Sequence, residues 1–502
     1  MSLNRRDVLR LAGVGALLTA CGGAPGAAPV QNAVVEARRG GTLRAVFTGG
    51  GAAESIDPFA GGSPVDFVRN DVIYDALFAL RGAAVEPALA LSVTPGPSSF
   101  ELKLRPDVKW HDGKAFTAED VAYSLKYMCS PDRPYPTQLG AYFDVAGVRV
   151  VDPLTLVVPT SRPVGDPALF LAAFPAKIVP NGFTGASAVG TGPYRVTAFE
   201  AGREARLERF EGHWAGSSPA DSLVLLSLSD PAAKVNAVST GQADFAGDIP
   251  FTTAKTGVPG FEVRTAGASA RTSFGFVLNA TKAPFNDPRA RRAVRLGIDR
   301  AALVNSVLLG YGTVGNDLLC AGAKYFTARE PLKRDVDQAR KLVSEAGLSG
   351  ASVTFRSAEW EIGYNASTQL VAEQLKDIGL TVKPQIVGPA EFFEPSAVAA
   401  ADAVAFSSGP SALAVIYGRI SGFPPLALGD KEFDTAFGRA IASASEAERA
   451  SAWETAQNVM YDRGNTVVWG LADVLSLARR EVAGVDVRDQ PKYPYLGKAG
   501  LA

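Results

Sequence analysis

From residue 40 onward, segments with the pattern of short strands alternate with helices whose ends are clearly marked. Aspartate followed by proline occurs at 230–231 and at 287–288, a pair that caps a helix and then occupies its first turn. Glycine stands where the helical spacing stops, at Gly241, Gly347 and Gly379. Alternating or apolar runs typical of strands lie at 40–47, 100–104, 154–158 and 380–384. The alternation predicts a mixed α/β protein with more than one sheet.

Two of the predicted helices carry charged residues with a more specific meaning. Residues 117–120, Thr-Ala-Glu-Asp, have nearly the pattern of a capping box, and apolar residues follow at helical spacing. The helix after Asp287 contains four arginines, at Arg289, Arg291, Arg292 and Arg295. Such a group would attract an anion if it formed one open patch, but we expect these arginines to form a solvated helix face.

The chain is too long for one compact domain and has no strong charge. It has 502 residues, of which 47% are hydrophobic, so two or three domains are expected. The net charge of -1 provides no basic field that would hold nucleic acid or an anionic membrane surface. Beyond the N-terminal segment, no apolar stretch approaches the length that crosses a bilayer.

The first twenty-one residues follow the order of a secretory signal. Arg5 and Arg6 precede an apolar run from residue 8 to 20, which is shorter than the about 20 apolar residues of a membrane-spanning helix. Small residues then lead to Cys21, as in a bacterial lipobox, where the thiol receives a diacylglyceryl group. We therefore expect residues 1–20 to be a signal peptide and 21–38 to be a lipid-anchored flexible tether. A buried N-terminal helix is the alternative, and export through either the Sec or the twin-arginine route stays open.

Cysteine and histidine are scarce. Besides Cys21 the chain has Cys129 and Cys320, which could form one disulfide in an oxidising compartment or remain two separate, partly buried thiols. The two histidines are His111 and His213. With so few of these ligands, we expect no transition-metal site made wholly by the protein.

Local motifs of catalysis are missing. The sequence contains no G-x-S-x-G elbow, no P-loop and no H-E-x-x-H, and the glycines at 49–51 do not continue as G-x-G-x-x-G. No spacing marks a pair of carboxylates of the glycosidase kind. We therefore expect neither a catalytic site nor a bound cofactor.

Several segments resemble one known family. Residues 106–121, PDVKWHDGKAFTAEDV, resemble the signature of extracytoplasmic solute-binding proteins of family 5, which are the oligopeptide, dipeptide and nickel receptors of ABC importers. Gly-Thr-Gly-Pro-Tyr at 190–194 and the helix that ends in G-x-x-D at 241–244 resemble further segments of that family. So do the stretches 283–300 and 337–347. Together they cover the chain from about residue 40 to its last strand.

The resemblance implies a two-lobed periplasmic-binding-protein-like α/β fold of type II, cluster C, with an extra subdomain on the first lobe and a two-strand hinge. The signature turn at 110–113 would then pack the subdomain, in preference to a catalytic dyad of His111 and Asp112. Carried over by motif, the first lobe would comprise 39–56, 190–268 and 475–502, the subdomain 57–189, and the second lobe 269–474.

The resemblance also implies where a solute would bind. Peptide-binding members often hold the ligand amine with an aspartate late in the second lobe, and the matching region here is 402–413, which begins with Asp402. The later Trp and Asp of that stretch are replaced by small and hydroxyl residues, which favours a modified peptide, an opine-like or sugar-like compound, or a metal chelate over an ordinary free peptide. The candidate ligand-binding residues are Glu54, Ser55, Asn316, Asp317, Trp360, Tyr364, Phe406, Ser407, Ser408, Tyr417 and Arg419.

The family implies a monomeric substrate-binding component of an ABC importer, outside the cytoplasm and anchored by lipid. It would capture a peptide or peptide-like solute by hinge closure and deliver it to the permease in the membrane, with no role for nucleic acid. A receptor for a non-peptide solute is the main alternative. An extracytoplasmic enzyme, a cell-envelope chaperone and a binding protein that feeds a sensor are the others.

Overall fold

The structure, a computed structural model, describes residues 30–31, 36–133, 137–173, 176–388, 391–488 and 490–502. The signal peptide, Cys21 and most of the tether lie outside the described residues, so the predictions about them stay predictions. Among the described residues, no helix is both long enough and apolar enough to cross a membrane.

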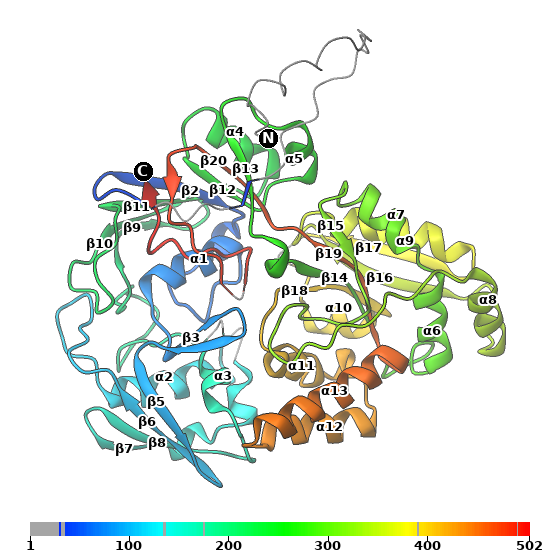
Figure 1. Cartoon of the computed structure of the whole chain (residues 1–502), viewed down its shortest axis with the longest axis horizontal. Coiled ribbons are helices and arrows are strands. Elements are labelled where there is room, and N and C mark those ends of the chain that lie inside the picture. The colour runs from blue at the N-terminus through cyan, green and yellow to red at the C-terminus, as the bar shows by residue number, and fades with distance from the viewer. Residues whose placement is uncertain (1–29, 32–35, 134–136, 174–175, 389–390, 489) are drawn as a thin grey trace, which may run out of the picture.

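An eight-stranded sheet forms the centre of lobe one (Figure 1), which here denotes this sheet, its helices and the C-terminal segment 482–502. Its strands, in spatial order, are β1 Val30–Gln31, β13 Glu262–Thr265, β20 Leu475–Ala478, β12 Phe245–Gly247, β2 Thr42–Phe47, β11 Ser222–Ser227, β10 Glu204–Arg209 and β9 Tyr194–Glu200. Its helices are α1 Pro64–Ile73, α4 Pro231–Ser239 and α5 Phe251–Thr256. The short strands β21 Val482–Ala483 and β22 Gly500–Leu501 pair with each other.

A six-stranded sheet forms the centre of lobe two, which denotes this sheet and helices α6 to α13. In spatial order its strands are β15 Gly312–Val314, β19 Thr466–Ala472, β14 Thr272–Leu278, β18 Ala403–Ser408, β16 Ser352–Ala358 and β17 Thr381–Val387. The helices are α6 Pro288–Gly297, α7 Arg300–Ser306, α8 Val336–Glu345, α9 Tyr364–Lys376, α10 Pro395–Ala400, α11 Leu413–Ser421, α12 Lys431–Ala442 and α13 Glu446–Arg463.

A third part, the subdomain, is built on an antiparallel four-stranded sheet. Its strands are β5 Ala90–Pro95, β6 Ser99–Leu104, β8 Thr155–Pro159 and β7 Arg149–Asp152, with the hairpin β3 Phe78–Arg81 and β4 Ala84–Pro87 beside them. Helices α2 Ala118–Cys129 and α3 Pro167–Leu171 complete it. Helix α1 packs on β2, β9 and β11 of lobe one, although it falls within the range predicted for the subdomain. The predicted residue limits of the three parts stay predictions.

Most of the local sequence signals are confirmed. The Asp230 carboxylate accepts a hydrogen bond from the Ala233 backbone N–H at 2.7 Å, and Thr117 and Asp120 form the complete capping box of α2. All four predicted strands are present, as β2, β6, β8 and β17. These signals succeed because each depends on residues only a few positions apart.

The expectation of a solvated arginine face on α6 is wrong for two of the four arginines. Arg295 is fully buried, and its Nε lies 3.1 Å from an Asp317 carboxylate oxygen. Arg291 is also buried and donates to the backbone carbonyls of Phe285 and Arg463 at 2.8 and 2.7 Å. A buried guanidinium is tolerated when most of its donors are paired, and here carbonyls and one carboxylate from other segments pair most of them.

The two lobes are joined by two crossings of the chain that run side by side. One crossing leads from β13 to β14 and the other from β19 to β20 (Figure 1). The Ala266 backbone N–H donates to the Val474 carbonyl at 3.1 Å, and Arg271 Nε lies 2.7 Å from Asp473 Oδ1. These contacts tie the two crossings into one narrow connection, which is the geometry of a hinge.

The signature turn packs the subdomain onto lobe one, as expected. The Trp110 side chain is buried, and its Nε1 donates to Asp120 Oδ2 at 3.3 Å. His111 Nε2 faces the Gly192 carbonyl at 2.9 Å, while His111 Nδ1 accepts from the Gly190 N–H at 3.2 Å. A neutral ring with its proton on Nε2 satisfies both contacts, and burial lowers the pKa of His111, which favours that neutral form. The histidine therefore joins two of the family-like segments.

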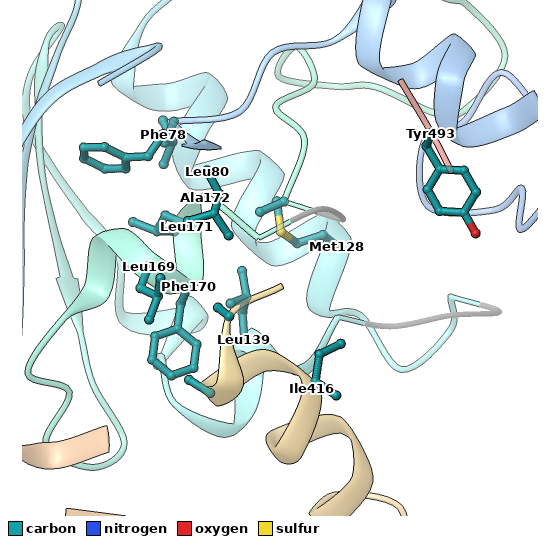
Figure 2. Close-up of a cluster of buried hydrophobic side chains, with 14 of the residues drawn as sticks. Phe78, Leu80, Met128, Leu139, Leu169, Phe170, Leu171, Ala172, Ile416 and Tyr493 are labelled. Atoms are coloured by element: carbon teal, nitrogen blue, oxygen red, sulfur yellow. The ribbon is translucent and has the colours of Figure 1, made fainter. Parts of the chain in front are cut away.

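Apolar side chains of the subdomain also meet lobe two. Figure 2 shows Leu139 of the subdomain between Ile416 of α11 and the side chains of Leu169 and Phe170, which also belong to the subdomain. All four side chains are buried and belong to one hydrophobic cluster. The subdomain thus contacts lobe two at a place apart from the hinge.

Both cysteines outside the N-terminal segment are free thiols. Cys129 lies in α2 of the subdomain, whereas Cys320 is fully buried in lobe two, where burial raises the pKa of its thiol to about 12. The two residues are therefore separate thiols and do not form a disulfide with each other.

Replacement of Gly190 by alanine tests the contact between the signature turn and α1. An added Cβ would lie 1.8 Å from the Ile73 carbonyl oxygen, so the backbone must move. We expect Gly190→Ala to destabilise the protein by about 1–3 kcal/mol. Gly438, exposed in α12 with open space around it, is the matched control, and Gly438→Ala should stabilise by up to about 1 kcal/mol. Urea midpoints of the two variants measure both effects, and equal midpoints would refute the packing argument.

Candidate functional site

The lobes meet at a buried ion cluster formed by Asp248, Lys492 and Glu361. Lys492, in the C-terminal segment of lobe one, lies with its Nζ 3.0 Å from Asp248 Oδ2 and also pairs with Glu361 of lobe two. Lys492 and Glu361 are both buried. Burial alone would lower the pKa of Lys492, but the two carboxylates raise it well above its ordinary value, so the ammonium stays charged.

The lobe-one half of this cluster is held in place by a second lysine. Lys234 of α4 is fully buried, and its Nζ donates to the carbonyls of Gly247 and Asp248 at 3.0 and 2.6 Å. Burial lowers the pKa of Lys234 to about 8. Asp248 itself has φ of 51°, a left-handed backbone that its neighbours must enforce. The carboxylate that meets Lys492 is therefore positioned by contacts within lobe one.

The ion cluster lies beside the hinge. Asp248 and Lys492 line the same small cavity as Ala266 and Val474, the residues that link the two crossings. Glu361, on the opposite lobe, follows β16 and precedes α9. Removal of one partner from a buried ion pair costs several kcal/mol because the remaining charge is left without compensation. The relative position of the lobes near the hinge is thus coupled to the pairing of Lys492.

Aromatic rings from both lobes surround the cluster. In lobe two, the ring of Trp360 packs edge-on against that of Phe393 with centroids 5.4 Å apart. In lobe one, the rings of Phe67 and Tyr493 lie 4.9 Å apart, and Tyr493 directly follows Lys492. Such rings provide apolar walls that accept solutes of varied shape, while a few polar groups fix the orientation.

Arg419, in the last turn of α11, reaches the same region. Its guanidinium carbon lies 5.8 Å from the centroid of the Phe393 ring, within the range of a cation–π contact. Tyr493 of lobe one and Tyr364 of lobe two both act on its charge. Arg419 therefore lies where side chains of the two lobes converge.

Four of the candidate ligand-binding residues come together here. Besides Arg419 they are Trp360, Tyr364 and Ser407, and Ser407 interacts with the side chains of both Glu361 and Tyr364. Trp360 and Ser407 are half-buried, whereas Tyr364 is fully buried against Phe274 and Phe392. Their contact with a solute stays a prediction, but their grouping around the ion cluster fits it.

Two of the candidate ligand-binding residues in lobe one, Glu54 and Ser55, make contacts within their own lobe. Glu54 is buried, accepts a hydrogen bond from the Gly50 N–H at 3.1 Å and lies 3.6 Å from Arg69. Ser55 donates its backbone N–H to the Asp66 carboxylate at 3.1 Å and accepts one from Asp57. These contacts fold the loop between β2 and α1.

The remaining candidates of lobe two are internal. Asp317 is fully buried between Arg295 and Arg300, and Asn316 donates to the Arg329 carbonyl at 3.0 Å. The other three, which pack inside lobe two, are Phe406, Ser408 and Tyr417.

Asp402, the residue matched to the acid that holds a ligand amine in peptide-binding members, is also engaged. Its Oδ2 accepts from the Thr354 backbone N–H at 2.8 Å, and its Oδ1 lies 3.1 Å from Lys282 Nζ. Asp402 therefore ties β16 to the start of β18 and has its charge paired within lobe two.

The residues that sequence reasoning missed are Asp248, Glu361, Lys492, Phe393 and Tyr493. Glu361 stands next to the candidate Trp360, and that proximity is the one sequence signal that pointed toward it. Lys492 and its partners are separated by 131 and more than 200 positions, so no local motif could pair them. Among the described residues, no three His, Cys, Asp or Glu side chains gather in a way that could hold a metal ion.

Two lobes, two parallel crossings and a polar and aromatic site between the lobes define the class of periplasmic binding proteins, and the fold class predicted from the sequence is confirmed. Residues 84–413 match the family described as bacterial extracellular solute-binding proteins, family 5 Middle. The chain belongs to this family, as the resemblance of its motifs indicated.

Three similar proteins illustrate the relationship. The glutathione-binding protein GsiB of Pectobacterium atrosepticum is 27% identical over 370 residues, which are 71% of this chain and 72% of that protein. The periplasmic binding protein DppA of Helicobacter pylori, solved with the peptide STSA, has a TM-score of 0.81 at 18% identity, over 92% of this chain and 98% of that chain. AgaA from A. tumefacien R10, solved with agropinic acid, has a TM-score of 0.80 at 19% identity, over 92% and 99%.

Replacement of Asp317 separates an internal role from a ligand-binding role. Asp317→Asn leaves Arg295 and Arg300 buried without their counter-charge, so we expect a loss of about 3–5 kcal/mol in stability. Solute affinity per folded molecule should be unchanged. Denaturation measures the stability, and calorimetric titration measures the solute affinity. A variant of normal stability that binds solute weakly would indicate that Asp317 contacts the solute.

Charge reversal at Glu361 tests the contact between the lobes. Glu361→Lys places a second buried cation against Lys492, so we expect closure to be disfavoured by about 3 kcal/mol and solute to bind roughly a hundredfold more weakly. Glu373→Lys, on the exposed face of α9, is the control and should bind normally. Scattering of each variant with solute measures closure, and wild-type compaction of Glu361→Lys would disprove the role of the cluster.

Proposed function

We propose that this chain is the substrate-binding component of an ABC importer, which captures a peptide or peptide-like solute between its lobes and delivers it to a membrane permease. Membership of family 5 supports the class of function, and the relatives named above are binding proteins. The observation that carries the proposal is the site itself, in which Lys492 and Tyr493 of lobe one face Glu361, Tyr364 and Arg419 of lobe two.

The mechanism is closure about the two crossings. A solute that touches both walls binds the closed form more tightly than the open form, and it shifts the population by that difference in affinity. Ala266, Arg271, Asp473 and Val474 form the narrow connection about which the lobes turn, with boundaries that we place at 268/269 and 474/475.

We place the protein outside the cytoplasm, as a monomer held at the membrane by lipid on Cys21. The tether 21–38 would keep it near the permease and raise its effective concentration there. We propose no catalysis, so the bound solute leaves the protein chemically unchanged.

A solute without a free peptide amine is the second candidate. Asp402 is already paired with Lys282 and hydrogen-bonded to Thr354, so the acid that would receive a ligand amine is occupied. A peptide with a modified amine or an opine-like compound fits this arrangement, in keeping with the agropinic acid with which AgaA is solved.

Small-angle scattering with three probes tests the proposal. Any bound solute is first removed from the protein by reversible unfolding. We then expect glutathione, the peptide Ser-Thr-Ser-Ala or agropinic acid to reduce the radius of gyration of the refolded protein. Mass spectrometry should then recover the probe intact. A protein that binds none of the three and keeps the same dimensions would contradict a receptor for peptide-like solutes, and recovery of a converted product would indicate an enzyme.

A further inference from the structure

The side chain of Arg419 is exposed, and the protein around its guanidinium desolvates that group and lowers its pKa. The guanidinium carbon lies 5.8 Å from the centroid of the Phe393 ring. Figure 1 places α11 on the side of lobe two that faces the rest of the molecule.

The charge of Arg419 has no acidic partner among the described residues. The groups that act on it are the phenols of Tyr493 and Tyr364, and its ring contact is with Phe393. Glu361, the acid in this region, is paired with Lys492. By contrast, the buried arginines Arg69, Arg295 and Arg300 each face a carboxylate. A guanidinium in a desolvating site is stabilised most by a carboxylate, which it binds through two parallel hydrogen bonds.

The polarity of the site is therefore opposite to that of an amine-binding pocket. Lobe two offers a cation at Arg419, while its matched acid, Asp402, is neutralised by Lys282. Close to this cation stand Phe393 and Trp360, whose rings can hold an apolar part of a solute.

We propose that Arg419 binds a carboxylate of the captured solute, and that the substrate class of this site is an anionic solute whose apolar part packs on Phe393 and Trp360. The inference rests on the proposed function and names the ligand class of the same site. Arg419 thus selects solutes by charge, and the aromatic walls accept differences in shape.

The experiment compares one mixture before and after its carboxylates are neutralised. An enzymatic protein digest with added glutathione is divided, and one half is methyl-esterified, which converts carboxylates to neutral esters. Wild-type protein, Arg419→Met and Arg419→Lys are freed of solute and incubated with each half, and the retained solutes are quantified by mass spectrometry. Arg340→Met, on the exposed surface of α8, is the matched control. Melting curves verify that each variant is folded.

We expect wild type and Arg340→Met to retain solutes from the untreated half only. Arg419→Met should retain roughly ten- to a hundredfold less, and Arg419→Lys should recover part of the loss because it keeps the charge without the planar fork. Equal retention from both halves, or normal retention by folded Arg419→Met, would overturn the inference and leave the proposed function standing. Retention of nothing by wild type from either half would overturn the proposed function and this inference with it.

Discussion

The buried ammonium group of Lys492 lies at the point where the two lobes meet, and it needs a carboxylate from each of them. Asp248 is fixed in lobe one by its backbone contacts to Lys234, whereas Glu361 arrives with lobe two. An unpaired buried charge is costly, so the arrangement of the lobes that pairs Lys492 with both acids has a lower free energy than arrangements that separate Lys492 from one acid. Electrostatics near the hinge thus contributes to the position of the lobes, in addition to solute.

The fold provides the rigid parts that this contact requires. The eight-stranded sheet carries Asp248 just after β12, and the six-stranded sheet carries Glu361 just after β16. Between them the chain crosses only twice among the described residues, and Arg271 pairs one crossing with the other through Asp473. Rigid lobes joined by a narrow connection concentrate the movement in few residues, so a small change at the connection moves the far walls by a larger distance.

Sequence predicted the local elements better than the site, and the difference has a physical cause. Helix caps such as Asp230 and Thr117 act on backbone groups within three residues, so their patterns are complete in the sequence. Asp317 lies between the buried Arg295 and Arg300, a pairing that no local pattern reveals, and its contact with a solute stays a prediction. Trp360, Tyr364, Ser407 and Arg419 are predicted from a resemblance that fixes their region, and their contact with a solute stays a prediction. Lys492 and Tyr493 come from a distant segment without a motif.

The pairing of charges also explains why Arg419 is informative about the solute. Most buried charged groups among the described residues face a partner of opposite sign, as Asp66 faces Arg69 and Asp317 faces Arg300. A charge that is paired within the protein stabilises the fold, and it is not available to bind a solute. Arg419 stands near aromatic rings and has no acidic partner among the described residues, and we propose that a carboxylate of the solute pairs with it. In a binding protein that must release its solute, one strong charge contact beside apolar walls gives selectivity without the many contacts that would slow release.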